Sequence, residues 1–324
     1  MKISVVVPTY RRPQLVTRCV DALIRQSFPS DEFEIIIVTD GPDEVTVNAL
    51  EPYTSLRAPV VKCYSLSKKK GPAAARNFGW RMSRSRLIAF TDDDCIPDAS
   101  WLAGFWNTFL RAPGSKMAFT GKTIVPIPPI PTDYERNIAH LASAEFITAN
   151  CACSKLALER VGGFDEQFTM AWREDSDLQF KFLEQRIPIL PAPSAKVTHL
   201  VRKAPWGISL KEEKKGIFNA LLYKKFPTLY KQKIQPMPPW HYYLILLSLA
   251  IGIVSALAGN STSALVFFGA WLCITFWFTA KRLAHTSHTA HHILEMIITS
   301  AVIPFLSVYW RIYGALKFKA PLIP

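Results

Sequence analysis

The stretch "LIAFTDDD", residues 87–94, combines a strand pattern with an unusual concentration of charge. Four apolar residues and Thr91 are typical of a buried strand, and three aspartates follow directly at its end. Adjacent carboxylates repel one another and resist leaving water unless positive charge lies beside them. The stretch therefore predicts a strand that delivers Asp92, Asp93 and Asp94 to a site that holds a cation.

Three apolar runs upstream have the same form, and segments with helical spacing separate them. These runs cover residues 3–7, 33–39 and 60–66. Alternation of strand and helix over residues 1–95 predicts a parallel sheet with helices on its faces. Ligands of such sheets bind at the carboxyl ends of the strands, so "PTYRR", "TDGPDE" and "KKKGP" are expected to share one edge with the three aspartates.

The composition indicates a folded protein with an excess of positive charge. Of the 324 residues, 49% are hydrophobic and 19% are charged, and the formal net charge is +13. Such charge fits nucleic acid, an anionic membrane or a phosphorylated substrate. The six scattered cysteines include no CxxC pair, which favours buried or half-buried free thiols in a reducing compartment over a zinc site.

Two uncharged stretches near the C-terminus predict a transmembrane hairpin. They cover about 241–258 and 263–280, and each is long enough to cross the hydrocarbon core. Basic residues lie on both outer sides, at 202–233 and at 281–282, so both ends are expected in the cytosol. The basic segment, which carries interleaved aromatic residues, is then expected along the anionic inner leaflet. This accounts for much of the net charge without nucleic acid.

A third apolar stretch, about 291–313, is interrupted by Glu295 and Pro304 and followed by basic residues. A third crossing would place those basic residues outside, so we expect an interfacial or re-entrant segment. The predicted organisation is a catalytic domain over 1–200, a basic amphipathic interface segment over 201–239 and a membrane region over 240–324.

Candidate chemistry lies in two acidic motifs and one histidine. Asp92 and Asp94, two apart at a strand end, share one side, so Mg²⁺ or Mn²⁺ can bind there with diphosphate oxygens. Asp175, in "WREDSD", is a candidate general base. His199 is a candidate ligand if the fold brings it near Asp94. The alternatives are a helix cap for either acidic motif and a structural role for the histidine.

A nucleoside can be held by "PTYRR" together with Asp40, which can accept from a base N–H. Arg76 begins the helix that follows "KKKGP" and suits contact with phosphate or ribose. A surface ion pair is the alternative interpretation of Arg76.

These motifs, in their order along the chain, resemble those of bacterial family-2 glycosyltransferases of the GT-A fold. The matching stretches are "SVVVPTYRR", "EIIIVTDG", "KGPAAARNFG", "IAFTDDDC", "ANCACSKLALERVGGFDE" and "WREDSDLQFKF". The resemblance covers about 1–200 and implies a Rossmann-like, mixed and mostly parallel sheet flanked by helices. The tail "PFLSVYWRIYGALKFK" resembles the membrane-associated C-terminus of some bacterial members.

The resemblance also implies roles for individual residues. Asp92 corresponds to the ribose contact, Asp94 to the metal ligand and Asp175 to the catalytic base, with His199 as a second candidate metal ligand. The nucleotide-binding positions are Pro8, Thr9, Arg11 and Asp40. The acceptor-side positions are Gly162, Gly163 and Phe164, to which we add Glu174. Thr39 stands where the family usually has another acidic residue, so recognition of the base, for which uracil is favoured, depends on Asp40.

The implied activity is inverting, metal-dependent transfer of a sugar from a nucleotide-diphosphate sugar, with UDP favoured, to a hydroxyl acceptor. We expect a lipid-linked or cell-envelope acceptor, and location at the inner membrane with the catalytic domain facing the cytosol. Two alternatives are a polyprenyl-phosphate sugar synthase, whose acceptor is a lipid phosphate, and a non-catalytic membrane-tethered sensor of nucleotide sugars.

Overall fold

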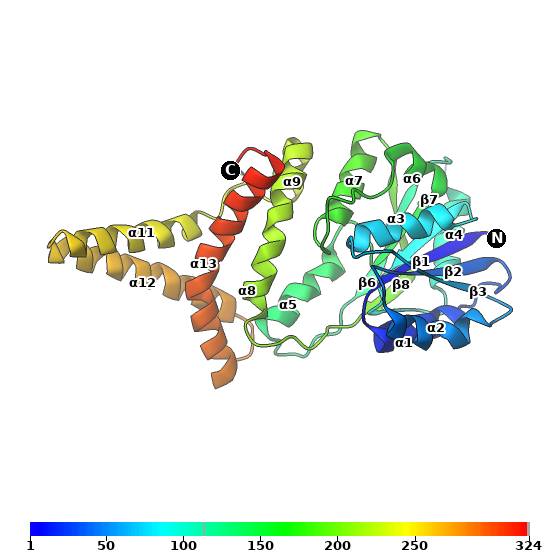
Figure 1. Ribbon diagram of the computed structural model, residues 1–324, viewed down its shortest axis with the longest axis horizontal. Coiled ribbons are helices and arrows are strands. Elements are labelled where there is room, and N and C mark those ends of the chain that lie inside the picture. Colours follow the sequence, from blue (N-terminus) through cyan, green and yellow to red (C-terminus); the bar gives the residue numbers. More distant parts are fainter. Residues whose placement is uncertain (113, 323–324) are drawn as a thin grey trace. The chain divides into compact units, whose positions relative to one another are not determined.

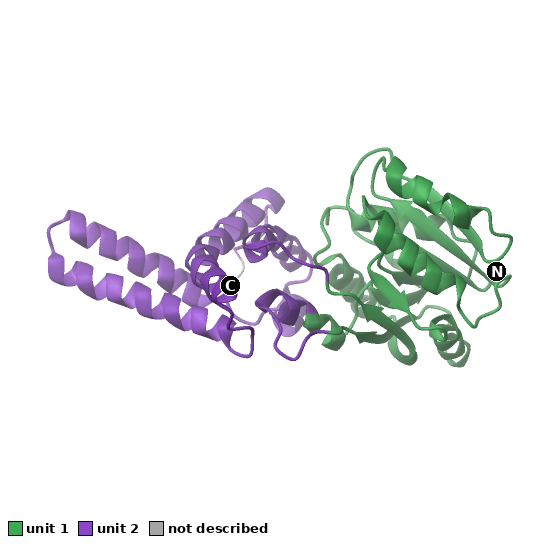
Figure 2. Ribbon diagram, turned by 90° about the horizontal axis from the view of Figure 1, so that it is seen from below, with its two compact units in different colours: residues 1–126, 139–201 green, residues 127–138, 202–324 purple. Residues whose placement is uncertain are grey.

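The computed structural model describes residues 1–112 and 114–322 and divides into two compact units. Unit 1 contains residues 1–126 and 139–201, and unit 2 contains residues 127–138 and the chain from 202 onward (Figure 2). The sequence-based division places the end of its first domain at residue 200. The segment 127–138, which the sequence-based division placed in the catalytic domain, belongs to unit 2.

Unit 1 is built on a mixed sheet that, within the described residues, has eight strands in the order β3-β2-β1-β4-β7-β6-β8-β5. Its first four strands are parallel, β7 is antiparallel to β4 and β6, and β8 is parallel to β6 and antiparallel to β5. The strands are β1 (Ile3–Thr9), β2 (Phe33–Thr39), β3 (Val60–Ser65), β4 (Leu87–Thr91), β5 (Cys95–Pro97), β6 (Ala118–Ile124), β7 (Asn150–Ser154) and β8 (Ile189–His199). The parallel half predicted for residues 1–95 is confirmed.

Helices cover both faces of this sheet, which explains why β1 and β2 are apolar without alternation. Every residue of β1 and β2 is buried. Alternate residues of β1 enter two cores, with Val5 and Val7 facing α1 and α4 and Val6 facing α3 (Figure 1). The helices are α1 (Pro13–Ile24), α2 (Glu44–Thr54), α3 (Pro72–Met82), α4 (Trp101–Arg111), α6 (Lys155–Val161) and α7 (Glu174–Glu184).

Unit 2 is helical. It contains most of α5 (Asp133–Ala139), the short helices α8 (Ile208–Glu212) and η2 (Glu213–Gly216), and then α9 (Ile217–Lys225), α10 (Pro227–Lys233), α11 (Trp240–Leu257), α12 (Ser261–Leu283) and α13 (Ala290–Phe318). Within the described residues, α11, α12 and α13 are the three helices long and apolar enough to cross a membrane. Helices α11 and α12 form the predicted hairpin (Figure 1).

Two expectations for unit 2 need correction. The third apolar stretch is one continuous helix that includes Pro304, so a re-entrant segment is wrong. Most aromatic residues of the basic segment are not on the surface, although Trp206 is 42% exposed. Phe218, Tyr223, Phe226 and Tyr230 are buried, because they form the packing between the short helices of unit 2.

Candidate active site

The carboxyl ends of β1, β2 and β4 bring the acidic motifs together at one edge of the sheet. At the end of β1, the Thr9 hydroxyl donates to Asp93 at 2.8 Å, and the Arg12 guanidinium donates to the same carboxylate at 3.0 Å. At the end of β2, the buried Asp40 carboxylate accepts from the backbone N–H groups of Lys70 and Gly71. Asp40 therefore fixes the "KKKGP" loop against the site, and this contact shapes the nucleotide side.

The three aspartates have different partners. Asp92 is 27% exposed and accepts from Arg76 at 2.7 Å. Asp93 is buried on Thr9 and Arg12, and burial raises the pKa of its carboxyl to about 6 against the lowering effect of Arg12. Asp94 faces His199. Two arginines therefore supply positive charge that the sequence analysis had assigned to a cation alone, and the pairs offset much of the repulsion within the triad.

Arg76 is a buried link between the two acidic motifs. Its side chain is 2% exposed, and its guanidinium donates to Asp92 at 2.7 Å and to Glu174 at 3.0 Å. The pKa of Arg76 is raised by these two carboxylates, so the group stays charged. The interpretation of Arg76 as a surface ion pair is wrong. The side chain reaches inward from the first half of α3 and connects β4 to the start of α7.

The acidic start of α7 carries two carboxylates with raised pKa values. Burial raises the pKa of Glu174 to about 7, with Asp175 adding to the effect and Arg76 opposing it. One oxygen of Glu174 has no hydrogen-bond partner among the described residues. Burial also raises the pKa of Asp175, although the Ser176 backbone N–H donates to its carboxylate at 2.6 Å. A half-buried carboxylate with a raised pKa is a better proton acceptor than an exposed one.

We expect Glu174→Gln to flatten the pH dependence of stability. The folded protein retains the Glu174 proton up to about pH 7, whereas the unfolded chain loses it near 4.5, so stability falls as pH rises between these values. In the variant, the fall in melting temperature from pH 5 to pH 7 should shrink but not vanish, because Asp93 titrates in the same direction. Glu184 is exposed at the other end of α7, so Glu184→Gln should leave the fall in melting temperature between pH 5 and pH 7 unchanged. An unaltered slope in Glu174→Gln would contradict the assignment.

The turn after α6 is held by Asn77. The Asn77 side chain donates to the Phe164 carbonyl at 2.9 Å and accepts from the Phe164 N–H at 3.0 Å. Phe164 is buried edge-on against Phe90, with Arg76 over its ring. The Phe164 side chain therefore packs against Phe90 and Arg76 and does not face solvent. Gly163, with a φ of +71°, lies close to the side chains of Asn77 and Trp80.

We expect Gly163→Ala to destabilise the protein more than Gly162→Ala. Both glycines have positive φ, which costs an L-residue about 1–2 kcal/mol. A Cβ at Gly163 would lie 2.6 Å from the Asn77 amide oxygen, whereas at Gly162 it would meet no described atom within 4 Å. Overpacking adds about 1–3 kcal/mol to the loss of free energy of unfolding in Gly163→Ala, but not in Gly162→Ala. Equal losses of free energy of unfolding in denaturant titrations would show that the contact does not matter.

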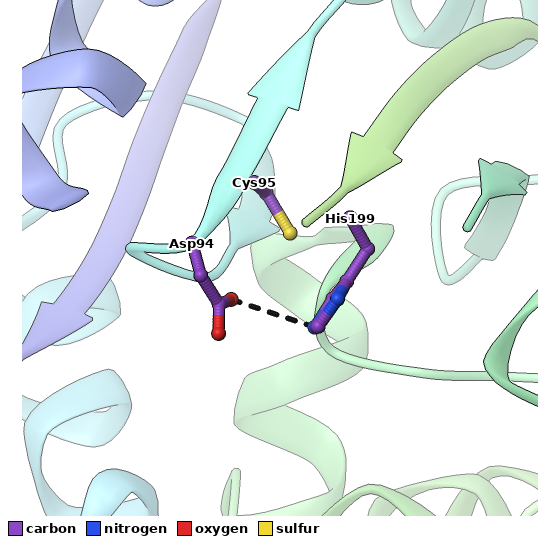
Figure 3. A group of neighbouring side chains, drawn as sticks. All are labelled: Asp94, Cys95 and His199. Atoms are coloured by element: carbon purple, nitrogen blue, oxygen red, sulfur yellow. Dashed lines mark ion pairs between the residues drawn. The ribbon is translucent and has the colours of Figure 1, made fainter. Parts of the chain in front are cut away.

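A group of possible metal ligands lies at the end of β4. The antiparallel pairing of β5 with β8 sets Cys95 opposite His199, and this brings the imidazole to Asp94, with 3.4 Å between Nε2 and the carboxylate oxygen (Figure 3). One ligand atom from each of Asp94, Cys95 and His199 lies within 4.8 Å of the others. His199 is 8% exposed, and its Nδ1 has no hydrogen-bond partner among the described residues.

The structure thus brings most predicted site residues to one edge. Thr9 and Asp40 lie at the ends of β1 and β2, and Arg11, in a left-handed backbone conformation, follows β1. Pro8, by contrast, is a buried member of β1 paired with β2. Sequence reasoning missed Cys95 beside the candidate metal ligands and the contact of Asn77 with Phe164. The strand pattern around "DDDC" indicated burial of the cysteine, but its neighbours depend on strand pairing.

Residues 4–122 match the family model described as glycosyl transferase family 2. A poly(ribitol-phosphate) beta-glucosyltransferase from Bacillus spizizenii is 33% identical over 107 residues, which are 33% of this chain and 17% of that relative. The chain therefore spans less than a fifth of the length of this relative.

Solved structures extend the likeness beyond the matched residues. The mannosyltransferase PcManGT from Pyrobaculum calidifontis, solved with GDP-Man and Mn²⁺, aligns over 94% of this chain and 87% of its own, with a TM-score of 0.58 at 19% identity. TarS 1–349 from S. aureus, solved with UDP-GlcNAc, aligns over 94% and 91%, with a TM-score of 0.51 at 16% identity. Residues 4–122 thus resemble the family-2 glycosyltransferases, and unit 1, with its mixed sheet, has the GT-A fold.

Proposed function

We propose that this protein is a membrane-attached inverting glycosyltransferase. It moves a sugar from a nucleotide-diphosphate sugar to a hydroxyl group of a cell-envelope polymer or lipid-linked glycan. The observation that carries the proposal is the Asp92–Arg76–Glu174 chain, which fixes the nucleotide-side carboxylate relative to Asp175, the proposed base. The name of the Bacillus spizizenii relative, a poly(ribitol-phosphate) beta-glucosyltransferase, favours a cell-envelope polymer as acceptor.

The donor is proposed to lie across the carboxyl ends of β1, β2 and β4. Thr9 and Arg11 flank the nucleoside after β1, Asp40 lies at the base side, and Asp92 accepts from the ribose hydroxyls. Solved neighbours carry UDP-GlcNAc or GDP-Man, so the fold alone leaves the base open. Of the two acidic residues that the family usually has at the end of β2, this chain has Thr39 in place of the first and keeps Asp40 as the second. We favour UDP because Asp40 can accept a hydrogen bond from a base N–H.

A divalent cation, Mg²⁺ or Mn²⁺, fits the group at the end of β4. Asp94 and His199 offer a carboxylate oxygen and an imidazole nitrogen 3.4 Å apart, and the second nitrogen of the ring is buried without a described partner. Oxygen-rich sites completed by diphosphate oxygens suit these ions. When bound, the cation supplies positive charge that offsets the charge developing on the diphosphate.

The chain's own residues then orient the acceptor and move its proton. Asp175 accepts the proton of the acceptor hydroxyl while that oxygen attacks the anomeric carbon from the face opposite the leaving diphosphate, which inverts the configuration. The backbone around Gly163, fixed through Asn77, lies on the acceptor side together with Glu174. Arg76 holds both carboxylate motifs at a fixed separation, which preserves the alignment of donor and base.

Membrane attachment is proposed through α11 and α12, with both ends of the hairpin in the cytosol. Basic residues lie before α11 and at the end of α12, and the turn between the helices carries none. For a bacterial protein this places the catalytic unit at the cytosolic side of the inner membrane. A membrane-bound acceptor also suits a polyprenyl-phosphate sugar synthase, and a mild-acid-labile phosphosugar product would identify that activity.

We expect Asp94→Ala to lose metal-dependent donor binding. A panel of nucleotide sugars is screened against the purified protein for thermal stabilisation, with Mn²⁺, with Mg²⁺ and with chelator. A donor at 100 times its dissociation constant stabilises the folded state by about 2.7 kcal/mol. This shift should require a cation in the wild type and be absent from the variant.

The control for this screen is Asp98→Ala, which lies four residues after Asp94, beyond β5, and outside the ligand group. It should keep the cation-dependent shift. Equal shifts with cation and with chelator in the wild type would contradict the metal site, and a panel without any shift would contradict the proposed function itself.

A further inference from the structure

Helix α13 presents two different faces along its length. One face is exposed and apolar, and its members recur at spacings of three and four residues, which places them on a single stripe. The exposed stripe consists of Leu294, Ile297, Ile298, Val302, Phe305, Tyr309, Ile312, Tyr313 and Leu316. An unbroken stripe of this size on a long helix is unusual for a surface that faces water.

The opposite face of α13 is packed on the short helices of unit 2. The Gly314 Cα is so close to α9 that a Cβ would lie 2.7 Å from the Ile217 carbonyl oxygen. The Lys224 ammonium donates to the Phe318 carbonyl at 2.8 Å, and the Phe318 ring contacts Phe218. Helix α9 therefore runs beside the C-terminal half of α13 and is fixed to it.

The N-terminal half of the same face is polar and holds the end of α12. The Arg282 guanidinium donates to the hydroxyls of Thr299 at 2.7 Å and Ser300 at 3.1 Å, and pairs with Asp133 at 2.7 Å. Glu295 accepts from the Gly207 N–H at 2.6 Å. Polar side chains on this face are thus satisfied inside unit 2, and the apolar stripe faces away from them.

The direction of α13 differs from that of the hairpin. Within unit 2, α11 and α12 run together along the horizontal direction of Figure 1, whereas α13 crosses that direction steeply and lies between the hairpin and α9. In Figure 2, which is turned about the horizontal axis, the hairpin still runs horizontally. A bilayer that the hairpin crosses along its axis therefore extends roughly parallel to α13.

From this arrangement we infer that α13 lies in the plane of the membrane surface. Its stripe is buried at the boundary of headgroups and acyl chains, and its opposite face carries α8, η2 and α9 on the cytosolic side. This rests on the membrane attachment proposed above but is independent of the sugar transfer. Amphipathic helices with aromatic residues on the apolar face bind this boundary, and Phe305, Tyr309 and Tyr313 are of this kind.

Charge distinguishes this placement from a third crossing. Helix η2 carries Lys214 and Lys215 and is packed along α13, with the Lys214 ammonium 5.7 Å from the centre of the Trp310 ring, so a crossing α13 would draw these lysines toward the hydrocarbon core. A helix in the membrane plane leaves them among anionic headgroups, together with Lys281 at the end of α12 and Lys317 at the end of α13. The occupant of the stripe is therefore the surface of an anionic bilayer.

The test measures the depth of single labels in the full-length protein. Spin labels are placed by Leu294→Cys, Phe305→Cys and Leu316→Cys, each with Cys273→Ser, because Cys273 is the exposed native cysteine. The protein is reconstituted in vesicles of three parts phosphatidylcholine and one part phosphatidylglycerol. Label depth is obtained from relaxation by oxygen and by a water-soluble nickel complex.

The expected result is a similar, shallow depth of about 5–10 Å for all three labels. A crossing helix would instead separate the first and last labels by about 33 Å along its axis. Leu265→Cys and Phe276→Cys on α12 provide the matched control and should differ in depth by about 16 Å.

Two results would overturn the inference. Graded depths along α13 would show a third crossing, and water exposure of all three labels would show that no lipid covers the stripe. Absence of graded depth on α12 would remove the membrane attachment on which the inference rests. A failed donor screen with the expected depths would leave the inference intact, so the two proposals fail separately.

Discussion

Replacing Asp175 by Asn should reduce sugar transfer by about 10²–10⁴-fold while leaving donor binding close to that of the wild type. Asn has nearly the same shape but cannot accept the proton of the acceptor hydroxyl. The proposed nucleotide-side residues Thr9, Asp40 and Asp92 are held by Asp93, by the Lys70 N–H and by Arg76, respectively, and these contacts remain in the variant. The measurements are initial rates with a radiolabelled donor and donor affinity by thermal shift.

The raised pKa of Asp175 adds a second observable. Its ordinary value is 3.8, and burial moves it upward, so the acidic limb of the pH–rate profile should lie above pH 3.8. Transfer should fall as pH is lowered through this limb, because the protonated carboxyl cannot act as a base.

Glu184→Gln is the control, because it removes a carboxylate from the exposed end of the same helix and should keep full activity. Turnover of Asp175→Asn within threefold of the wild type would exclude Asp175 as the base.

Replacing Arg76 by Ala should lower the free energy of unfolding by about 3–5 kcal/mol, because it leaves Asp92 and the buried Glu174 without their shared positive partner. Burial makes this loss far larger than that of a surface pair. Arg81→Ala is the matched control on the same helix, where the exposed Arg81–Glu166 pair should cost about 0–1 kcal/mol.

The double variant Arg76→Ala, Glu174→Gln should recover part of the loss, because an uncharged amide tolerates the buried position better than a carboxylate. These values are measured by denaturant unfolding of the full-length protein at pH 7.5. If Arg76→Ala and Arg81→Ala lose the same stability, the link between the acidic motifs is not what holds this edge together. A lower transfer rate with unchanged stability would also speak against the structural part of the argument.

The sequence predicted the parallel half of the sheet well because its signal is local. Continuous apolar runs at 3–7, 33–39 and 87–91 can be buried only between two helical layers, and the polar motifs at their ends must then share an edge. The two helices of the hairpin were equally clear, because a run of about 18 uncharged residues is typical of a helix that crosses a membrane.

The partners of the acidic side chains were not predictable in the same way. Nothing local shows that Arg76 reaches both Asp92 and Glu174, because Glu174 lies 98 positions away in the chain. The sequence suggested contact with phosphate or ribose for Arg76, with a surface ion pair as the alternative, and a cation to offset the charge of the three aspartates, whereas the fold supplies Arg76 and Arg12 as their partners. The burial of Phe218 and Tyr230 in unit 2 was missed for the same reason, since basic neighbours mask an apolar packing face.

By itself the sequence determined the order of strands and helices in the parallel half of the sheet, the edge at which the polar motifs gather and the presence of long apolar helices. Only the tertiary structure decided which charges meet. The pairing of β5 with β8 sets His199 beside Asp94, and the fold buries Arg76 of α3 between Asp92 and Glu174. The physical reason is range: hydrophobic periodicity acts over a few residues, whereas ion pairs and ligand groups join atoms that the chain brings together only when its sheet closes.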